Sequence, residues 1–280
     1  MKREDVLNFA CLTECADSCC TGATLITMDE IRLVYDVFPL TVGFRNYIPV
    51  SADHRDLLEM VGFREGNRYV VGDFVAGNRL RRICSALEGG RLCRLHREGR
   101  KPMQCRLVPF CALYPEEMQD VVLAEQKRDS FSGCRGILTG PSTDPRVWSH
   151  GRFTDPGYRS AYYGFQRGLA RQRGFMGRLL DSLRQQRPYQ DFLRGEGILE
   201  AAMPVSMLFD VLDAAGLSSE EYLTFIREQR RLCHGEVAAG HPIPIVLKDS
   251  LTTLDHVARQ YADFAGPGKT ERGLSKDRAE

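Results

Sequence analysis

The chain has 280 residues, of which ten are cysteine, and its formal net charge at pH 7 is +1. This length allows one large domain or two small ones. Hydrophobic residues make up 43% of the chain and charged residues 27%, which is the composition of an ordinary globular protein. Because the net charge is close to zero, overall charge neither supports nor excludes a nucleic-acid partner.

The beginning of the chain, Met1 to Asp5, is charged and is not followed by the apolar segment of a secretory signal. No apolar stretch approaches the length that a membrane-spanning helix needs. We therefore expect a cytoplasmic protein without a membrane partner. Thiols are kept reduced in the cytoplasm, so clustered cysteines there bind metal more often than they form disulfides.

Four cysteines lie within ten residues near the start of the chain: Cys11, Cys15, Cys19 and Cys20. Buried cysteines that only fill space are usually scattered along a sequence. Soft sulfur ligands at short, regular intervals are what zinc or an iron–sulfur cluster requires, because several thiolates must converge on one point. We expect residues 1–22, which hold this first set, to form irregular turns.

A second set of cysteines follows, and we expect folding to bring it together with the first set. The predicted metal ligands are Cys11, Cys15, Cys19, Cys20, Cys84, Cys93, Cys105 and Cys134. Eight thiolates could hold two four-sulfur sites or one larger cluster, and four are enough for one cubane. Cys111 and His96 are left open as ligands, and Cys233 is interpreted as a buried or free thiol.

The local patterns predict a mixture of short strands and helices before about residue 147. Thr27 and Glu30 form a capping box that opens a helix of about ten residues ending before Pro39. The other expected elements are a helix at 53–61 stopped by Gly62, a strand at 68–75, a hairpin of 83–85 with 91–95, extended chain at 105–110, and a strand at 119–123.

The rest of the chain predicts helices. Asp155-Pro156 opens a long one, in which four glycines either permit close packing or mark a break. Further helices are expected at 204–215, after the Ser218–Glu221 capping box, and at 249–261.

The fold class that follows is α+β, with a small irregular cysteine-rich domain at 1–147. An all-α region at 148–265 and a disordered tail at 266–280 complete the expected organisation.

Iron–sulfur is favoured over zinc by the spacing of the first four cysteines. Structural zinc sites usually have two residues between paired cysteines, whereas the gaps here are three, three and zero. We therefore predict a [4Fe–4S] cluster, with Zn²⁺ as the alternative cofactor.

Basic residues surround the second cysteine set. Between positions 79 and 106 there are nine, against only Glu88 and Glu98. Cations near an anionic cluster stabilise it, and we predict that Arg94 and Arg106 contact the cofactor. A solvated surface is the alternative. Nucleic acid is disfavoured as a partner, because few aromatic residues are interleaved with the basic ones.

The order of these motifs resembles the YkgJ-type CxxCxxCC family of zinc- or iron-chelating cysteine-cluster proteins. The resemblance rests on the terminal Cys19-Cys20 pair, then Cys84 and Cys93, then Lys101-Pro102-x-x-Cys105-Arg-x-x-Pro109-Phe110, then Cys134-Arg-Gly136-x-x-x-Gly140. It covers about residues 9–140 and implies an iron–sulfur or zinc domain, but no reaction.

The first cysteine spacing departs from that family by having gaps of three residues in place of two, and lysine stands before Pro102 where arginine is usual. With Phe9 before Cys11 and Gly22 after Cys20, it is also similar to the flagellin lysine methylases. That resemblance implies S-adenosylmethionine as a further candidate cofactor and a protein as substrate.

No motif assigns catalytic residues. The chain has no glycine-rich dinucleotide loop, no His-Glu-x-x-His and no serine nucleophile elbow. The leading hypothesis is a metal-cluster protein that transfers electrons or modifies a protein, with a redox partner or a protein substrate. The alternatives are a methylase-like enzyme and a non-catalytic interaction protein stapled by zinc.

Overall fold

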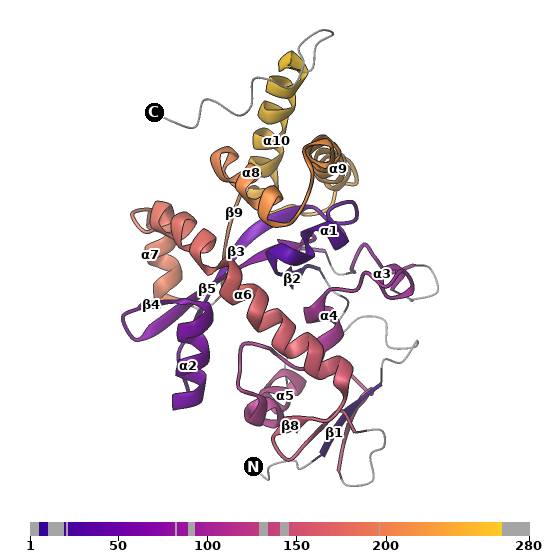
Figure 1. Ribbon diagram of the computed structural model, residues 1–280, viewed down its shortest axis with the longest axis vertical. Helices are drawn as coiled ribbons and strands as arrows, with labels where there is room; N and C mark the ends of the chain where they lie inside the picture. Colours follow the sequence, from indigo (N-terminus) through magenta and orange to yellow (C-terminus); the bar gives the residue numbers. More distant parts are fainter. Residues whose placement is uncertain are drawn as a thin grey trace.

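Two antiparallel sheets and a set of helices make up the computed structural model of the chain (Figure 1). The structure describes residues 6–10, 20, 22–81, 83–88, 93–128, 134–140, 146–195 and 197–264. The expected α+β class is confirmed in its coarse form: strands and helices are mixed, and the C-terminal part is mainly helical. The expected tail at 266–280 lies outside the described residues.

The larger sheet has the strand order β2-β5-β3-β9, with β4 also paired to β5. Its strands are β2 (Thr24–Ile26), β3 (Leu40–Tyr47), β4 (Phe63–Glu65), β5 (Arg68–Ala76) and β9 (Ile198–Ala201). Of these only β5 was predicted. The expectation of an all-α region at 148–265 is wrong, because three strands lie within it. One of them, the edge strand β9, pairs with β3, so this sheet joins distant parts of the chain.

The smaller sheet has the order β6-β1-β7-β8. Its strands are β1 (Val6–Phe9), β6 (Ile137–Thr139), β7 (Trp148–Ser149) and β8 (Arg152–Phe153). Strand β1 corrects the expectation of irregular turns for residues 6–9. The β7–β8 turn is His150-Gly151, with φ of 48° and 83°, and positive φ at both central residues suits the right-handed twist of a hairpin.

The helices before residue 130 are short. They are η1 (Met28–Glu30) and α1 (Ile31–Val34), then α2 (Ala52–Val61), α3 (Arg94–Arg97), α4 (Met103–Leu107), η2 (Glu116–Met118) and α5 (Gln119–Arg128). The Thr27–Glu30 capping box and the stop of α2 at Gly62 are confirmed. The predicted strand at 119–123 is wrong, because Gln119 and the residues after it continue the turn of η2 into α5.

Two other predicted elements are also wrong. The extended segment at 105–110 begins inside helix α4. In place of a hairpin, the structure has a single β-bridge between Leu87 and Cys93, and α3 begins at Arg94. Residues 89–92, the expected turn, lie outside the described ranges.

The long helix α6 (Pro156–Leu183) is confirmed, with the Asp155 carboxylate accepting from the Tyr158 N–H at 2.9 Å. None of its glycines breaks it, and two of them permit close packing. A β-carbon on Gly168 would lie 2.6 Å from Thr27, and one on Gly164 would lie 2.7 Å from Met103 Sδ. Helix α6 can therefore lie directly against η1 and α4.

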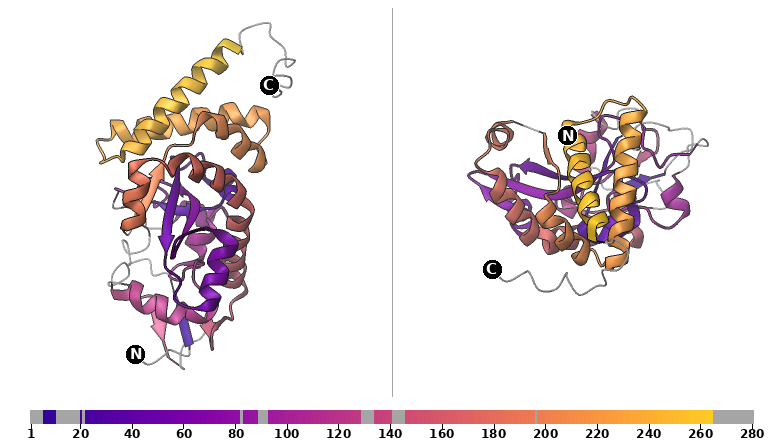
Figure 2. Two further views of the ribbon diagram at one scale, coloured as in Figure 1. Left: turned by 90° about the vertical axis from the view of Figure 1, so that its left-hand side faces the viewer. Right: turned by 90° about the horizontal axis from the view of Figure 1, so that it is seen from above.

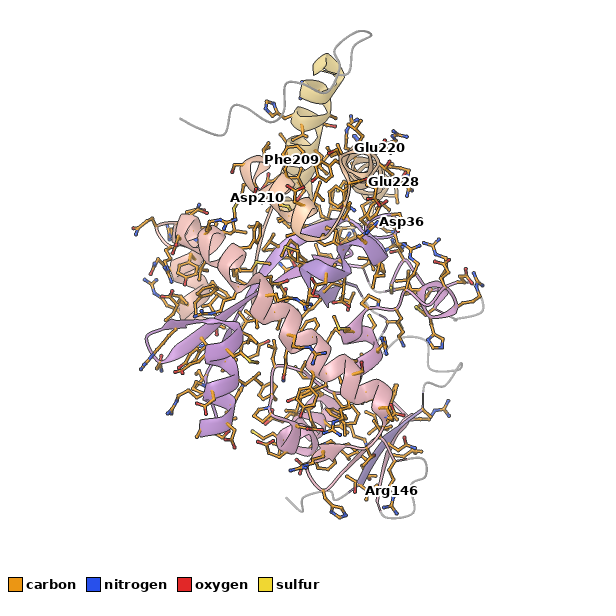
Figure 3. All side chains as sticks on the ribbon, in the orientation of Figure 1. Asp36, Arg146, Phe209, Asp210, Glu220 and Glu228 are labelled. Carbon is orange, nitrogen blue, oxygen red and sulfur yellow. The ribbon has the colours of Figure 1, made fainter. Side chains whose placement is uncertain are left out.

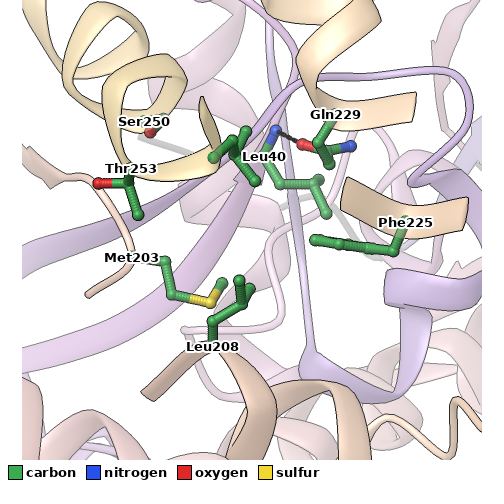
Figure 4. A pocket seen from close by; sticks show the side chains of 8 residues that line it. Leu40, Met203, Leu208, Phe225, Gln229, Ser250 and Thr253 are labelled. Atoms are coloured by element: carbon green, nitrogen blue, oxygen red, sulfur yellow. Dashed lines mark hydrogen bonds between the residues drawn. The ribbon is translucent and has the colours of Figure 1, made fainter. Parts of the chain in front are cut away.

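The C-terminal helices are α7 (Arg187–Arg194), α8 (Val205–Ala214), α9 (Ser219–Ala238) and α10 (Ile245–Phe264). Figure 2 shows α9 and α10 lying across one end of the larger sheet. Gln229 of α9 joins these helices to the sheet. Its Nε2 donates to the Tyr35 and Phe38 carbonyls, and its Oε1 accepts from the Leu40 N–H at 2.8 Å (Figure 4). The predicted helices in this region are confirmed.

Gln172 of α6 has the same role at the middle of β5. Strands β4 and β2 leave the edge of β5 open around Gly72, whose carbonyl accepts from Gln172 Nε2 at 2.9 Å. Gln172 Oε1 accepts from the Met28 N–H at 2.7 Å. The side chain is fully buried, so water cannot replace these bonds.

We expect Gln172→Leu to lower the free energy of unfolding by about 2 to 4 kcal/mol, because it leaves a buried N–H and a buried C=O unpaired. Urea unfolding followed by circular dichroism measures this. Gln190→Leu, at an exposed position of α7, is the control and should change stability by no more than about 0.5 kcal/mol. Equal effects of the two changes would contradict the assigned role.

Candidate metal centre

Cys105 is held by helix α4 beside strand β2. Its thiol donates to Thr24 Oγ1 at 3.1 Å, and burial raises the pKa of the thiol to about 12. The helix begins at Met103, whose N–H donates to Glu30 Oε1 at 2.6 Å. Because Glu30 Oε2 also accepts from the Thr27 N–H at 2.9 Å, one buried carboxylate fixes α4 to the start of η1.

Cys84 and Cys20 lie side by side. The Cys84 N–H donates to the Cys20 carbonyl at 2.8 Å, and the Ala86 N–H donates to Cys84 Sγ at 3.4 Å. Burial, with a smaller contribution from the nearby Cys20 and Cys93, raises the pKa of the Cys84 thiol to about 11. Cys93, at the start of α3, reaches this position through the bridge to Leu87.

Four predicted ligands are near enough to one another to affect each other's pKa, and we call them the thiol cluster: Cys20, Cys84, Cys93 and Cys105. They come from separate segments, and the charge on one thiol affects the pKa of its neighbours, including that of Cys105 by Cys84 and Cys20. No disulfide joins the seven cysteines that the structure describes.

The thiol cluster is not a complete metal site by itself. Within the described ranges, no three or more histidine, cysteine, aspartate or glutamate side chains are arranged to hold a metal ion. Cys11, Cys15 and Cys19 lie outside these ranges. The prediction that they complete the site stays a prediction.

The other cysteines are placed elsewhere. Cys134 is buried in the hydrophobic cluster that also contains Leu7 and Ile137. Cys111 lies near Arg45 of β3, and burial raises the pKa of its thiol. Cys233 is buried in α9, among the residues that join the C-terminal helices to the larger sheet.

Carboxylates pair with most of the described basic residues near the cysteines, three of them from distant segments. The ion pairs are Arg79–Glu200, Arg81–Glu236, Arg94–Glu98, Arg97–Glu88 and Arg100–Asp36. For Lys101 and Arg106, no described carboxylate lies within ion-pair distance. Arg81 lowers the pKa of Cys84 and Lys101 lowers that of Cys105, so cations do act on the cluster.

Arg94 and Arg106, the two arginines predicted to contact the cofactor, line different hollows. Arg106 lines one of about 420 Å³ with His96, Lys101 and Tyr158, which we call the basic hollow. Arg94 lines one of about 510 Å³ that also contains Asp36, Glu228 and Arg231. Figure 3 shows Asp36 and Glu228 on the same side of the molecule. Of these two hollows, the basic hollow has the more positive lining, because Lys101 and Arg106 face a single carboxylate there, that of Asp155.

Sequence reasoning missed a buried polar group on the larger sheet. Strand pairing puts Asp73 of β5 opposite Gly43 of β3, and Gly43 opposite Glu200 of β9. Thr41 and Arg45 flank Gly43 on the same face of β3, because side chains two apart share a face. We call these five residues the Asp73 row. A lone aspartate inside the apolar run Val70 to Val75 was the available signal.

The Asp73 carboxylate is fully buried, and neither of its oxygens accepts a hydrogen bond from any described group. Burial raises its pKa to about 7; the attraction of Arg45 lowers it and the charge of Glu200 raises it. The row lies on the face of the sheet opposite the thiol cluster. Thr24, which accepts from the Cys105 thiol, pairs with Ala76. Ala76 and Asp73 are three positions apart in β5, so their side chains point to opposite faces.

Comparison with protein-family models, curated proteins and solved structures finds no match for the chain. The resemblance to the cysteine-cluster family therefore rests on the motifs alone. No helix in the described part of the chain is long and apolar enough to cross a membrane.

We expect Glu30→Gln to lower the free energy of unfolding by about 1 to 3 kcal/mol and to expose Cys105 to alkylation sooner. The new amide group would face a backbone N–H where a carboxylate oxygen now accepts. Denaturant titration and mass spectrometry of alkylated Cys105 measure both effects. Glu117→Gln, exposed in η2, is the matched control and should match the wild type.

We expect Asp73→Asn to stabilise the protein at pH 8, on the order of a few kcal/mol, and to have little effect near pH 4. The folded pKa of about 7 is above the ordinary 3.8, so the wild type loses stability as pH rises from about 4 to 7. Asparagine does not ionise, so Asp73→Asn removes this loss of stability. Unfolding curves across this range measure it, with exposed Asp56→Asn as control. Parallel pH profiles of wild type and Asp73→Asn would contradict the expectation.

Proposed function

We propose that this chain is a metal-cluster protein that binds a [4Fe–4S] cluster through its clustered cysteines. The observation that carries the proposal is the thiol cluster, in which cysteines far apart in sequence interact with one another. Scattered core cysteines would have no reason to converge in this way.

The donors in the thiol cluster are of the kind that an iron–sulfur cluster takes. No disulfide joins them within the described part of the chain, they are only partly exposed, and they come from loops, the start of α3 and the short helix α4. The raised pKa of Cys84 and of Cys105 keeps these thiols neutral without metal. Metal binding deprotonates coordinating thiols, so assembly should release protons and stabilise the fold around Cys20, Cys84 and Cys105.

When bound, the cluster would supply electron transfer or a fixed point for binding a substrate. The basic hollow lies beside Cys105, because Lys101 and Arg106 flank that cysteine in sequence. Its lining has two cationic side chains, Lys101 and Arg106, and one carboxylate, Asp155, and this net positive charge suits an anionic group on a redox partner or on a protein substrate. S-adenosylmethionine remains the candidate cofactor if the reaction is a methyl transfer.

Metal and sulfide analysis of protein purified without oxygen tests the proposal. We expect iron with a roughly equal amount of acid-labile sulfide and broad absorbance near about 400 nm. Stoichiometric zinc without sulfide would overturn the iron–sulfur assignment and support the zinc-stapled alternative.

Single cysteine variants identify the ligands. We expect Cys84→Ser and Cys105→Ser to lose most of the bound iron, because each removes a thiolate from the thiol cluster. Cys233→Ser, buried in α9, is the matched control and should keep the wild-type iron content. Equal iron content in all three variants would contradict the assignment.

A further inference from the structure

We propose that the Asp73 row binds the α-amino-carboxylate group of a small molecule, with Asp73 holding the ammonium and Arg45 the carboxylate. This site lies on the other face of the larger sheet from the thiol cluster. The proposal goes beyond the metal-binding function and does not rest on it.

The Asp73 row contains buried hydrogen-bond acceptors that lack donors. Both Asp73 oxygens and Thr41 Oγ1 are buried without a hydrogen-bond partner. Leaving such groups unpaired is unfavourable, and more so for a charged group. Buried polar groups of this kind are rare in folded proteins and mark places where a donor from outside the chain is missing.

Gly43 leaves room for the Asp73 carboxylate. It stands directly between Asp73 and Glu200 across three neighbouring strands. A β-carbon there would lie 2.9 Å from Asp73 Oδ1 and 2.7 Å from Val75 Cγ2. Only glycine therefore lets the Asp73 carboxylate lie over β3, where it is near Thr41 and Arg45.

The positive and negative charges of the site are balanced. The Asp73 row has two carboxylates and the Arg45 guanidinium, and Arg79 pairs with Glu200 at 2.8 Å. Two positive and two negative groups make the site neutral when Asp73 is ionised. A simple cation would be repelled by the arginines, and a simple anion by the carboxylates. A zwitterion, with opposite charges a few ångströms apart, satisfies both signs without adding net charge.

Access of a ligand to the site is from an edge of the larger sheet. Strand β9 is an edge of the larger sheet, and the Arg79 side chain at this edge is 42% exposed. A ligand could therefore keep its own side chain near Arg79 while its charged group reaches inward to Asp73. The ligand could be a free amino acid or the amino-acid portion of a larger molecule such as S-adenosylmethionine.

Calorimetric titration at pH 8 with the twenty L-amino acids and with S-adenosylmethionine tests the proposal. We expect at least one to bind with a Kd below about 10 mM. For the best ligand, the analogue without the amino group and the methyl ester should each bind at least about tenfold more weakly. A free amino acid binding as well as S-adenosylmethionine would identify the former as the source of the group; tighter binding of S-adenosylmethionine would identify the latter.

Substitutions in the Asp73 row test whether the ligand binds there. Asp73→Asn should weaken it at least about tenfold, and Thr41→Val, which keeps the shape of the side chain, should weaken it severalfold. Asp120→Asn, at a buried position of α5, is the matched control and should bind as the wild type does. Folding of each variant is checked by circular dichroism, and Thr41→Val keeps the test valid if Asp73→Asn does not fold.

Two results would overturn the proposal. One is the absence of binding by every amino acid and by S-adenosylmethionine at about 10 mM. The other is unchanged affinity in folded Asp73→Asn or in Thr41→Val. The titration is repeated with Cys105→Ser, which should lose metal but keep amino-acid binding. Failure of the metal assignment and failure of this proposal can therefore be told apart.

Discussion

The buried carboxylate of Glu30 is the interaction on which the placement of the thiol cluster depends. It accepts from the Thr27 N–H and hydroxyl on one side and from the Met103 N–H on the other. A helix as short as α4 has little stability alone, so its position must come from outside itself. Glu30 supplies that position, and Gly164 and Gly168 of α6 let the long helix lie close enough to hold both partners in place.

The same physical requirement recurs elsewhere in the molecule. Irregular backbone that is buried must find hydrogen-bond partners, and here buried glutamines supply them. Gln172 joins α6 to β5, Gln229 joins α9 to β3, and Gln119 holds the turn between Cys111 and Pro115. These side chains make the frame around the cysteines rigid. Asp73 and Thr41 are exceptions, since their side-chain oxygens stay unpaired in the same frame.

Local signals predicted the helices far better than the strands. Capping residues such as Asp155 and Ser218 act within one turn, so the sequence near them is enough to place a helix start. Strands β1, β3 and β9 were missed because their pairing partners are distant, and β3 has no clear alternation since both of its faces are covered. At Gln119, a short apolar run fits a strand or a helix equally well, and the preceding turn decided for the helix.

The sequence by itself determined the residue types of the candidate metal site and the start of most long helices, because cysteine spacing and capping are local properties of the chain. It could not show that Glu200, Glu236 and Asp36 neutralise arginines that looked like a cationic patch. Nor could it show that Cys111 lies by Arg45 and apart from the thiol cluster, or that Asp73 faces Gly43 across the sheet. Those facts depend on strand register and on contacts between residues that are far apart in sequence, from 64 positions for Asp36 and Arg100 to 155 for Glu236 and Arg81, which only the tertiary structure fixes.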